Sequence, residues 1–434
     1  MKNLLTSYPR TIRRVLLRHR IIRTILLGFI LWNLAELHLT LRLVSQSDTI
    51  YQDRPHRTER IYIAMVNWNN EYILRSHLSK AITELSWKLG PENIYISIYE
   101  SGSYDNTKGA LVELDAELEQ LKVPRNITLS YVSHADEIAA PPDGEGWVVT
   151  PRGKKELRRI PYLSRVRNHS LESLRRLAKQ GTHFDKILFL NDVVFTSNDV
   201  LELLNTNHGD YAAACSLDFS KPPFYYDTFA LRDSHGHEAV TPIWPFFRDA
   251  SSRHAMKKLL PVPVKSCWNG MGIFHHSSFE KELVQISKCS ANHGVVVAMP
   301  AAPFFASPPL RFRGIPDSLA SHHLEGSECC LIHADNPLSR DHGVYLNPRV
   351  RVGYTTAAYV AVNPTLNWLT PRAVLQGLWW NRISRWTNFA YFKERPISRK
   401  ITQWASLSAD RQEAGGFCVV DEMQILDPRG WYHV

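Results

Sequence analysis

Residues 184–195 read FDKILFLNDVVF and contain one of the strongest strand signals of the chain. Its apolar centre, residues 186–190, is continuous rather than alternating, which is typical of a strand buried on both faces of a parallel sheet. Asn191 and Asp192 interrupt the run, and apolar residues resume directly afterwards. The pattern predicts a polar pair that is held firmly at the end of a core strand.

Two similar strands lie earlier in the chain, at residues 61–66 (IYIAMV) and 94–99 (IYISIY). Each is followed by apolar residues three and four apart, which predict helices over residues 73–89 and 108–122. Alternating strands and helices indicate an α/β protein with a Rossmann-type, mostly parallel sheet and right-handed crossovers.

The later segments complete this fold. Residues 135–161 are rich in Pro, Gly and charged residues and are expected to form a loop, whereas residues 163–180 have the apolar spacing of a helix. Beyond residue 210 the pattern breaks into short strands and loops. We expect one catalytic domain over residues 60–363.

Polar residues cluster where the three predicted strands end. The first strand is followed by three asparagines, the second by acidic and hydroxyl residues, and the third by an Asn-Asp pair. In open parallel sheets, ligands bind beyond the carboxyl ends of the strands. These clusters therefore predict a ligand site, whose members are Asn67, Asn69, Asn70, Glu100, Ser101, Ser103, Asp105, Asn191 and Asp192.

The charge of the chain is concentrated at its N-terminus. The formal net charge is +9, and residues 1–60 hold eleven of the 51 basic and four of the 42 acidic residues. The rest of the chain is nearly neutral, which argues against a nucleic-acid binder because that function needs a distributed basic surface.

Arginines precede an apolar run at residues 24–35 (TILLGFILWNLA). We expect a cytosolic tail at residues 1–20, a transmembrane signal-anchor at 21–43 and a polar stem at 44–59. Such a single-pass type II protein would place its body in the lumen of the Golgi or the endoplasmic reticulum. An arginine-rich amphipathic targeting helix is the alternative.

Glycosylation sequons at Asn126 and Asn168 agree with a lumenal body. Six cysteines allow fifteen complete pairings, among which the sequence does not choose, although the adjacent Cys329 and Cys330 are not expected to pair with each other. The extension at residues 364–434 holds six of the twelve tryptophans. We expect it to pack on the body; a belt at a membrane interface is the alternative.

Six motifs follow one another along the body. They are Glu100-Ser101-Gly102-Ser103-Tyr104-Asp105, Arg165-Val166-Arg167-Asn168, Leu190-Asn191-Asp192-Val193, Tyr226-Asp227-Thr228-Phe229, Cys267-Trp268-Asn269-Gly270 and Glu328-Cys329-Cys330-Leu331. Over about residues 60–352 the chain resembles the fungal cryptococcal mannosyltransferase and capsule-associated family, glycosyltransferase family sixty-nine.

The resemblance implies a GT-A-like fold and transfer of mannose from GDP-mannose to a mannoside acceptor. It further implies an α-1,3 linkage, retention of anomeric configuration, and Mn²⁺ or Mg²⁺ as cofactor. The rival interpretation is a non-catalytic protein of the same fold that supports capsule or wall assembly, which the single acid in place of Asp-x-Asp would favour.

For the donor side we expect Asp192 and His333 to bind the metal ion. The expected donor-binding residues are Glu100, Ser101, Ser103, Asp105, Arg165, Arg167, Asn168 and Asn191. Each has a structural alternative: a turn cap for Asp192, a helix cap for Asp105, surface ion pairs for the arginines and a structural role for the histidine.

For the sugar side, three acids are candidates for the base or for the carboxylate that supports a cationic sugar, with Asp227 favoured over Asp218 and Asp233. Trp268, Asn269 and Gly270 resemble a sugar-binding platform; a tryptophan buried in the core is the alternative.

Overall fold

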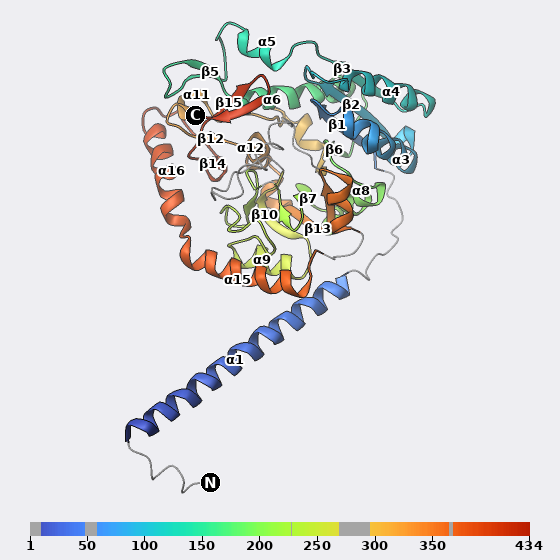
Figure 1. Cartoon of the computed structure of the whole chain (residues 1–434). Helices are drawn as coiled ribbons and strands as arrows, with labels where there is room; N and C mark the ends of the chain where they lie inside the picture. The colour runs from blue at the N-terminus through green and yellow to red at the C-terminus, as the bar shows by residue number, and fades with distance from the viewer. Residues whose placement is uncertain (1–9, 48–58, 227, 269–295, 364–367) are drawn as a thin grey trace.

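The computed structural model describes residues 10–47, 59–226, 228–268, 296–363 and 368–434 (Figure 1). A ten-stranded mixed sheet runs through the body in the order β3-β2-β1-β6-β11-β7-β13-β10-β9, and β8 pairs with β7. Its strands are β1 (Ile61–Asn67), β2 (Ile94–Glu100), β3 (Arg125–Leu129), β6 (Lys186–Leu190), β7 (Ala213–Lys221), β8 (Phe224–Tyr225), β9 (Arg232–Asp233), β10 (Val262–Ser266), β11 (Val296–Pro300) and β13 (Val344–Gly353).

Strands β1, β2 and β6 are parallel neighbours, as the alternating pattern predicted, and β3, which was not predicted, pairs parallel with β2. Strand β11 then runs antiparallel to both β6 and β7, while β13 is parallel to β7. The expected α/β class with a mostly parallel sheet is therefore confirmed, with antiparallel strands confined to its second half.

Side chains of β1 alternate between two hydrophobic clusters, one on each face of the sheet. Ile61, Ile63 and Met65 belong to the cluster under α3 and α4, whereas Tyr62 and Ala64 belong to the larger cluster on the other face. Both faces are therefore covered. The helices of the body are α2 (Glu71–Ile73), α3 (Ser79–Leu89), α4 (Thr107–Gln120), α5 (His134–Ala139), α6 (Arg159–Ser170), α7 (Glu172–Lys179), α8 (Ser197–Leu204), α9 (Ala250–Lys257), α11 (Asp317–Ala320), α12 (Glu328–Asp335), α13 (Ser339–His342) and α14 (Thr356–Val362).

Two expectations about local structure were wrong in part. Residues 135–161 hold α5 and the hairpin of β4 (Trp147–Val149) and β5 (Lys155–Leu157), not only loop. The helix expected over residues 163–180 is divided at Leu171 into α6 and α7. A Ser133–Asp136 capping box starts α5, at the beginning of the segment whose composition indicated a loop.

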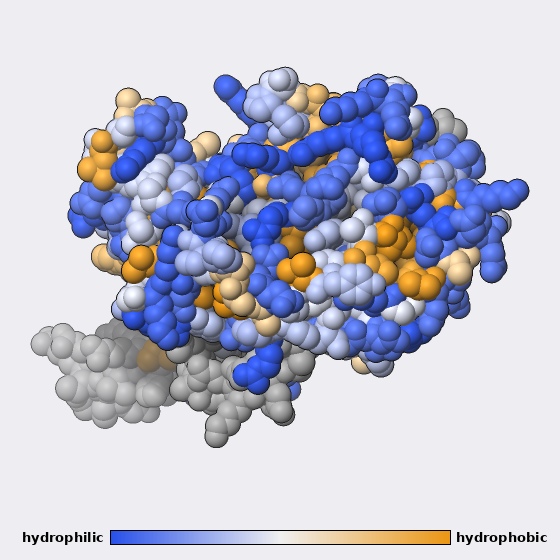
Figure 2. Space-filling view, turned by 90° about the horizontal axis from the view of Figure 1, so that it is seen from above, coloured by the Kyte–Doolittle hydropathy of each residue, from blue (hydrophilic) through white to orange (hydrophobic). Residues whose placement is uncertain are grey.

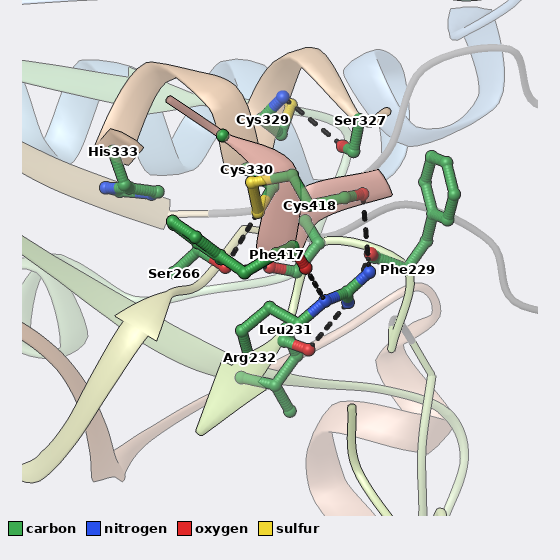
Figure 3. The surroundings of a disulfide bond; sticks show 12 residues. Phe229, Leu231, Arg232, Ser266, Ser327, Cys329, Cys330, His333, Phe417 and Cys418 are labelled. Carbon is green, nitrogen blue, oxygen red and sulfur yellow. Dashed lines mark hydrogen bonds between the residues drawn. A yellow bond between two sulfur atoms is a disulfide. The ribbon is translucent and has the colours of Figure 1, made fainter. Parts of the chain in front are cut away.

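The C-terminal residues pack along the body as α15 (Pro371–Thr387), α16 (Ala390–Ala405), β14 (Val419–Val420), β15 (Gln424–Asp427) and β16 (Gly430–His433). Strand β14 pairs with β12 (Glu325–Gly326), and the Cys330–Cys418 disulfide joins α12 to the same segment (Figure 3). Nearby, the buried Arg232 donates to the carbonyl oxygens of Phe417 and Phe229. The chain end is thus fixed to the body.

A second disulfide, Cys215–Cys267, connects β7 to the end of β10. Cys329 lies outside both disulfides, and the adjacent pair Cys329 and Cys330 is not bonded to itself, as expected. Cys289 lies outside the described residues.

Helix α1 (Arg10–Ser47) extends away from the body (Figure 1). Its section Arg20–Ser45 is long and apolar enough to cross a membrane, a test that signal sequences also pass. Toward its C-terminal end the helix packs on the body: Thr40 and Val44 are buried, and Glu36 pairs with Lys257 of α9 at 3.1 Å.

Candidate active site

The ends of β1, β2 and β6 meet at one edge of the sheet because the three strands are parallel. Asn67, the last residue of β1, is in register with Glu100, the last residue of β2. The backbone N–H of Ser101 donates to the carbonyl of Asn67 at 3.0 Å, which holds the two strand ends together. The expected edge of polar groups is present.

Asp192, two residues beyond β6, is linked to the loop after β1. The amide nitrogen of Asn70 donates to Oδ2 of Asp192 at 3.0 Å. Asn70 is itself fixed, because its backbone N–H donates to Oγ1 of Thr107 at 2.7 Å and its Oδ1 accepts from Trp68 N–H at 2.9 Å. Only 5% of Asp192 is exposed, so its carboxylate is held in a defined orientation.

Arg167 of α6 lies in the electrostatic field of Asp192. Its Nε donates to Oε1 of Glu328 at 3.0 Å, and both side chains are almost fully buried. Burial acts to lower the pKa of Arg167, but Cys329, Glu328 and Asp192 outweigh it, so the pKa is raised overall and the guanidinium stays charged. A permanent positive charge therefore interacts electrostatically with the Asp192 carboxylate.

Asp218 lies at the same edge of the sheet as Asp192. Val297 of β11 is in register with both Phe189 and Cys215, and each aspartate is three residues beyond its strand partner. Strand β11 separates the two strands that carry them. Asp218 is fully buried, and it is the only one of the three candidate acids for the sugar side that the described residues place at this edge.

The polar residues after β2 mainly organise their own loop. Glu100 accepts from Ser103 N–H at 2.5 Å and pairs with Lys108 at 3.0 Å. Ser103 Oγ accepts from Asn69 N–H at 2.8 Å, and the exposed Asp105 accepts from Thr107 N–H at 3.1 Å. Their contact with a donor remains a prediction; the structure shows that they shape the loop that would border it.

The structure separates the two arginines of the expected phosphate fork. Arg165 is exposed and pairs with Glu137 at 2.5 Å, whereas Arg167 points into the interior. Asn168 exchanges hydrogen bonds with the backbone of Phe312, as donor at 2.8 Å and acceptor at 3.1 Å. Its amide therefore holds a loop in place, and Arg167 is the member of this group that interacts electrostatically with Asp192.

Two expected roles conflict with the geometry. Both carboxylate oxygens of Asp233 accept backbone N–H groups, two at 3.0 Å and one at 2.8 Å, so this residue organises a turn. Trp268 is fully buried, with Phe189, Phe312 and the Arg167 guanidinium 4.9, 5.4 and 5.3 Å from its ring, so it is a core residue and not an open sugar platform.

His333 is also better explained by packing than by metal binding. Its Nε2 donates to the carbonyl of Cys267 at 2.6 Å, and burial lowers its pKa to about 4, so it is neutral. The nearest group of potential ligands is Cys215 and Cys267, whose sulfurs are joined in a disulfide and are not thiolates. Asp227, Asn269 and Gly270 lie outside the described residues.

The oxygen atoms at the edge fit a hard divalent cation. Asp192 supplies a carboxylate, and Oδ1 of Asn67 is buried with no hydrogen-bond partner among the described residues. Mg²⁺ and related cations commonly bind through one or two carboxylates, with waters and substrate phosphates completing the shell. The donor set is therefore adequate for a cation that arrives with a diphosphate.

Two contacts of this arrangement were not predicted from the sequence. Asn70 was recognised as part of a polar strand end, but its bond to Asp192 joins positions 122 residues apart. Glu328 was noticed only within a sequence motif, and its partner Arg167 is 161 positions away. Neither contact has a signal in local spacing.

An α/β sheet with buried charged groups at the carboxyl edge of its parallel strands is the framework of an enzyme that binds its ligand at that edge. A family model described as Cryptococcal mannosyltransferase 1 matches residues 60–335. The chain belongs to this family, and it is a glycosyltransferase.

Solved structures give weaker likenesses. The mannosyltransferase PcManGT from Pyrobaculum calidifontis, in complex with GDP-Man and Mn²⁺, is 9% identical over 87% of this chain and 83% of its own, with a TM-score of 0.35. TarS 1-349 of S. aureus, in complex with UDP, is 9% identical over 80% and 70%, with a TM-score of 0.34. These scores are too low to support an argument. No curated protein matches the chain.

Proposed function

We propose that this glycosyltransferase moves mannose from GDP-mannose to a mannoside acceptor, with an α-1,3 linkage, retention of configuration and a divalent metal ion. The proposal also includes anchoring by α1 in the Golgi or endoplasmic reticulum membrane, with the body lumenal. The observation that supports it best is the Asp192 carboxylate, oriented by Asn70 at the edge where β1, β2 and β6 end.

In this proposal Asp192 and Asn67 hold Mn²⁺ or Mg²⁺, which supplies positive charge to the departing diphosphate. Asn70 keeps the carboxylate turned toward that edge, and Asn191 lies next to it in the chain. Arg167 adds a charge that cannot be lost at physiological pH. The residues act by orientation and electrostatic stabilisation, which require no movement during the reaction.

Asp218 is the described carboxylate that we assign to the cationic sugar or to the acceptor hydroxyl. It lies beyond β11 from Asp192, so the sugar would bind between the two acids. Glu100, Ser101, Ser103 and Asp105 would border the nucleotide through the loop that they shape. The N–H groups of guanine and the hydroxyl groups of ribose in GDP can donate hydrogen bonds to carboxylate and hydroxyl oxygens.

The test uses the full-length protein in detergent with GDP-mannose, an α-mannobioside acceptor and Mn²⁺. Asp192→Asn keeps the shape and the contact with Asn70 but removes the charge, so we expect mannosyl transfer to fall by at least about 100-fold, the usual range for loss of one electrostatic group. The matched control is Asp115→Asn. Asp115 lies on α4, is half exposed and pairs with Arg125 of β3, so this variant should retain activity.

The donor is tested separately by titration calorimetry. GDP-mannose should bind more tightly with Mn²⁺ than without it, and Asp192→Asn should remove this difference while Asp115→Asn keeps it. Preferential binding of UDP-xylose, or binding that is unaffected by metal in the wild-type protein, would refute this part of the proposal. Transfer that survives Asp192→Asn would refute the role of the carboxylate.

A further inference from the structure

Helices α15 and α16 present aromatic and aliphatic side chains to solvent. Trp380, Ile383 and Trp386 of α15 are spaced by three residues and are each more than half exposed. Phe389, Tyr391 and Phe392 continue this exposure across the junction with α16. The opposite side of α15, with Val374 and Leu378, is buried in the core. The exposed apolar side chains of α15 and the start of α16 therefore form an outer face, on the side of α15 that points away from the core.

This outer face lies beside α1. Trp379 Nε1 donates to Oδ1 of Asn33 at 2.6 Å, and its ring lies 5.3 Å from Phe29 and 5.9 Å from Trp32. One turn further along, Arg382 forms an ion pair with Glu36. Figure 1 shows α15 at the end of the body from which α1 projects. Helix α15 therefore contacts the C-terminal end of the apolar section of α1, at Phe29, Trp32 and Asn33.

The length of α1 determines what covers this face. From Arg20 to Asn33 the helix is about 21 Å long, at 1.5 Å per residue, whereas a bilayer hydrocarbon core is about 30 Å thick. If α1 spans the membrane, as the proposed function states, this short section draws the body against the lipid surface. The first part of the body to reach that surface is α15.

The chemistry of the face matches a lipid surface. A hollow of about 390 Å³ on α15 is lined by Gln376, Trp379, Trp380 and Ile383, and it is almost wholly apolar in its walls. Tryptophan and arginine are the residues enriched where proteins meet the headgroups and upper acyl chains of a bilayer. The opposite end of the body, seen from above in Figure 2, is mostly hydrophilic with scattered apolar residues.

Basic groups surround the same helix. Helix α15 contains Arg372, Arg382 and Arg385 and no acidic residue. Burial, followed by the charges of Arg382 and Arg248, lowers the pKa of Arg385, which shows that the guanidinium groups are close enough to repel one another. Phosphate groups of lipids would relieve this repulsion, because arginine binds phosphate through parallel hydrogen bonds.

We infer that the outer face of α15 and the start of α16 is a membrane-binding surface, which lies in the headgroup region of the bilayer that α1 crosses. The aromatic side chains enter the boundary between headgroups and acyl chains, and Arg372 and Arg385 contact lipid phosphates. The anchor then does more than tether: two contacts fix the orientation of the body on the membrane.

The test places an environment-sensitive NBD probe on single introduced cysteines of the full chain, in nanodiscs of phosphatidylcholine and phosphatidylserine. Trp386→Cys reports on the proposed surface, and Trp87→Cys on α3 is the control with a similarly exposed tryptophan. Leu27→Cys reports on α1 itself. Labelling without reductant keeps the native disulfides, Cys329 is buried, and every variant also carries Cys289→Ser.

We expect the probe at position 386 to show blue-shifted emission and at least twofold quenching by lipids with a nitroxide near the headgroup, while position 87 stays unquenched. Position 27 is read with lipids that carry the nitroxide deep in the acyl chain, and quenching there without headgroup quenching at 386 would overturn the inference and leave the anchor intact. Absence of quenching at both would overturn the anchor and the inference together. Because the quencher is a lipid, a protein partner on this face would give the unquenched result.

Discussion

Arg158 and Glu325 form a buried ion pair whose loss should destabilise the protein in a pH-dependent way. Both side chains are completely buried, and the guanidinium contacts the carboxylate at 2.5 and 3.1 Å. A third bond of 2.7 Å goes to Asp317. Glu325 also belongs to β12, which pairs with the C-terminal strand β14, so the ion pair supports the attachment of the chain end.

Arg158→Met leaves Glu325 buried with an uncompensated charge, which costs about 3–5 kcal/mol in comparable pairs. For a body of roughly 380 residues the entropy of unfolding is about 0.8 kcal/mol per kelvin, so the apparent Tm should fall by about 4–6 °C. In Arg158→Met/Glu325→Gln the buried charge is absent, so the double variant should be more stable than Arg158→Met alone.

The pH dependence gives a second readout. Burial already raises the pKa of Glu325 in the wild-type protein, although Arg158 opposes this, and without Arg158 the pKa must rise further. Between the unfolded and folded pKa values the native state then binds the extra proton, so the stability of Arg158→Met increases as the pH is lowered. The Tm difference from wild type should therefore be smaller at pH 5.5 than at pH 8.

The assay is thermal unfolding of the full chain in detergent, followed by tryptophan fluorescence at both pH values. Arg152→Met, at an exposed arginine paired with Glu156, is the control and should shift the Tm by less than about 1 °C. The reasoning is refuted if the double variant is no more stable than Arg158→Met, or if the Tm loss is the same at both pH values.

Three further predictions concern acid stability, glycosylation and the disulfides. Burial lowers the pKa of His134 and of His333 to about 4, so both are neutral in the folded protein. Their contribution to stability is therefore complete above about pH 6.5 and is lost as the pH drops toward 4. A Tm that is constant from pH 7 to 4.5 would contradict this. In a eukaryotic host Asn126→Gln should remove a glycan and increase gel mobility, because this sequon lies on the edge strand β3. Asn168→Gln should leave mobility unchanged, because the Asn168 amide donates to the Phe312 carbonyl. A mobility shift with Asn168→Gln alone would refute this. Cys418→Ser removes the disulfide that closes a loop of 88 residues. By the loop-entropy relation the free energy of unfolding should fall by up to about 4.6 kcal/mol, measured as a lower denaturation midpoint. An unchanged midpoint would contradict this prediction.

The parts of the fold that the sequence predicted are those governed by local pattern. Strands β1, β2 and β6 are continuous buried runs, and their parallel pairing follows from the helices between them. Strand β11, which separates Asp192 from Asp218, is also a continuous apolar run, but its place between β6 and β7 was not predicted. Its antiparallel insertion depends on tertiary packing, which a single segment does not encode.

The candidate site shows the same limit. Asp192 at the end of β6 was predicted because an acid that interrupts an apolar run is conspicuous. Trp268 was misjudged because its neighbours Phe189 and Phe312 are distant in the chain. The separation of Arg165 from Arg167 was foreseeable, since residues two apart on a helix do not share a face.

The position of Cys329 next to Cys330 has a consequence for how the protein can be made. During oxidation, two neighbouring thiols compete for Cys418, and only Cys330 gives the native bond. A chain that links Cys329 instead would bring β14 to α12 shifted by one residue, which also misplaces Glu325 on β12. Recovery from that error requires thiol–disulfide exchange that ends in a stable disulfide, whereas the cytosol keeps thiols reduced. Production in a compartment with a disulfide isomerase should therefore give a higher yield of native enzyme than refolding or cytosolic expression.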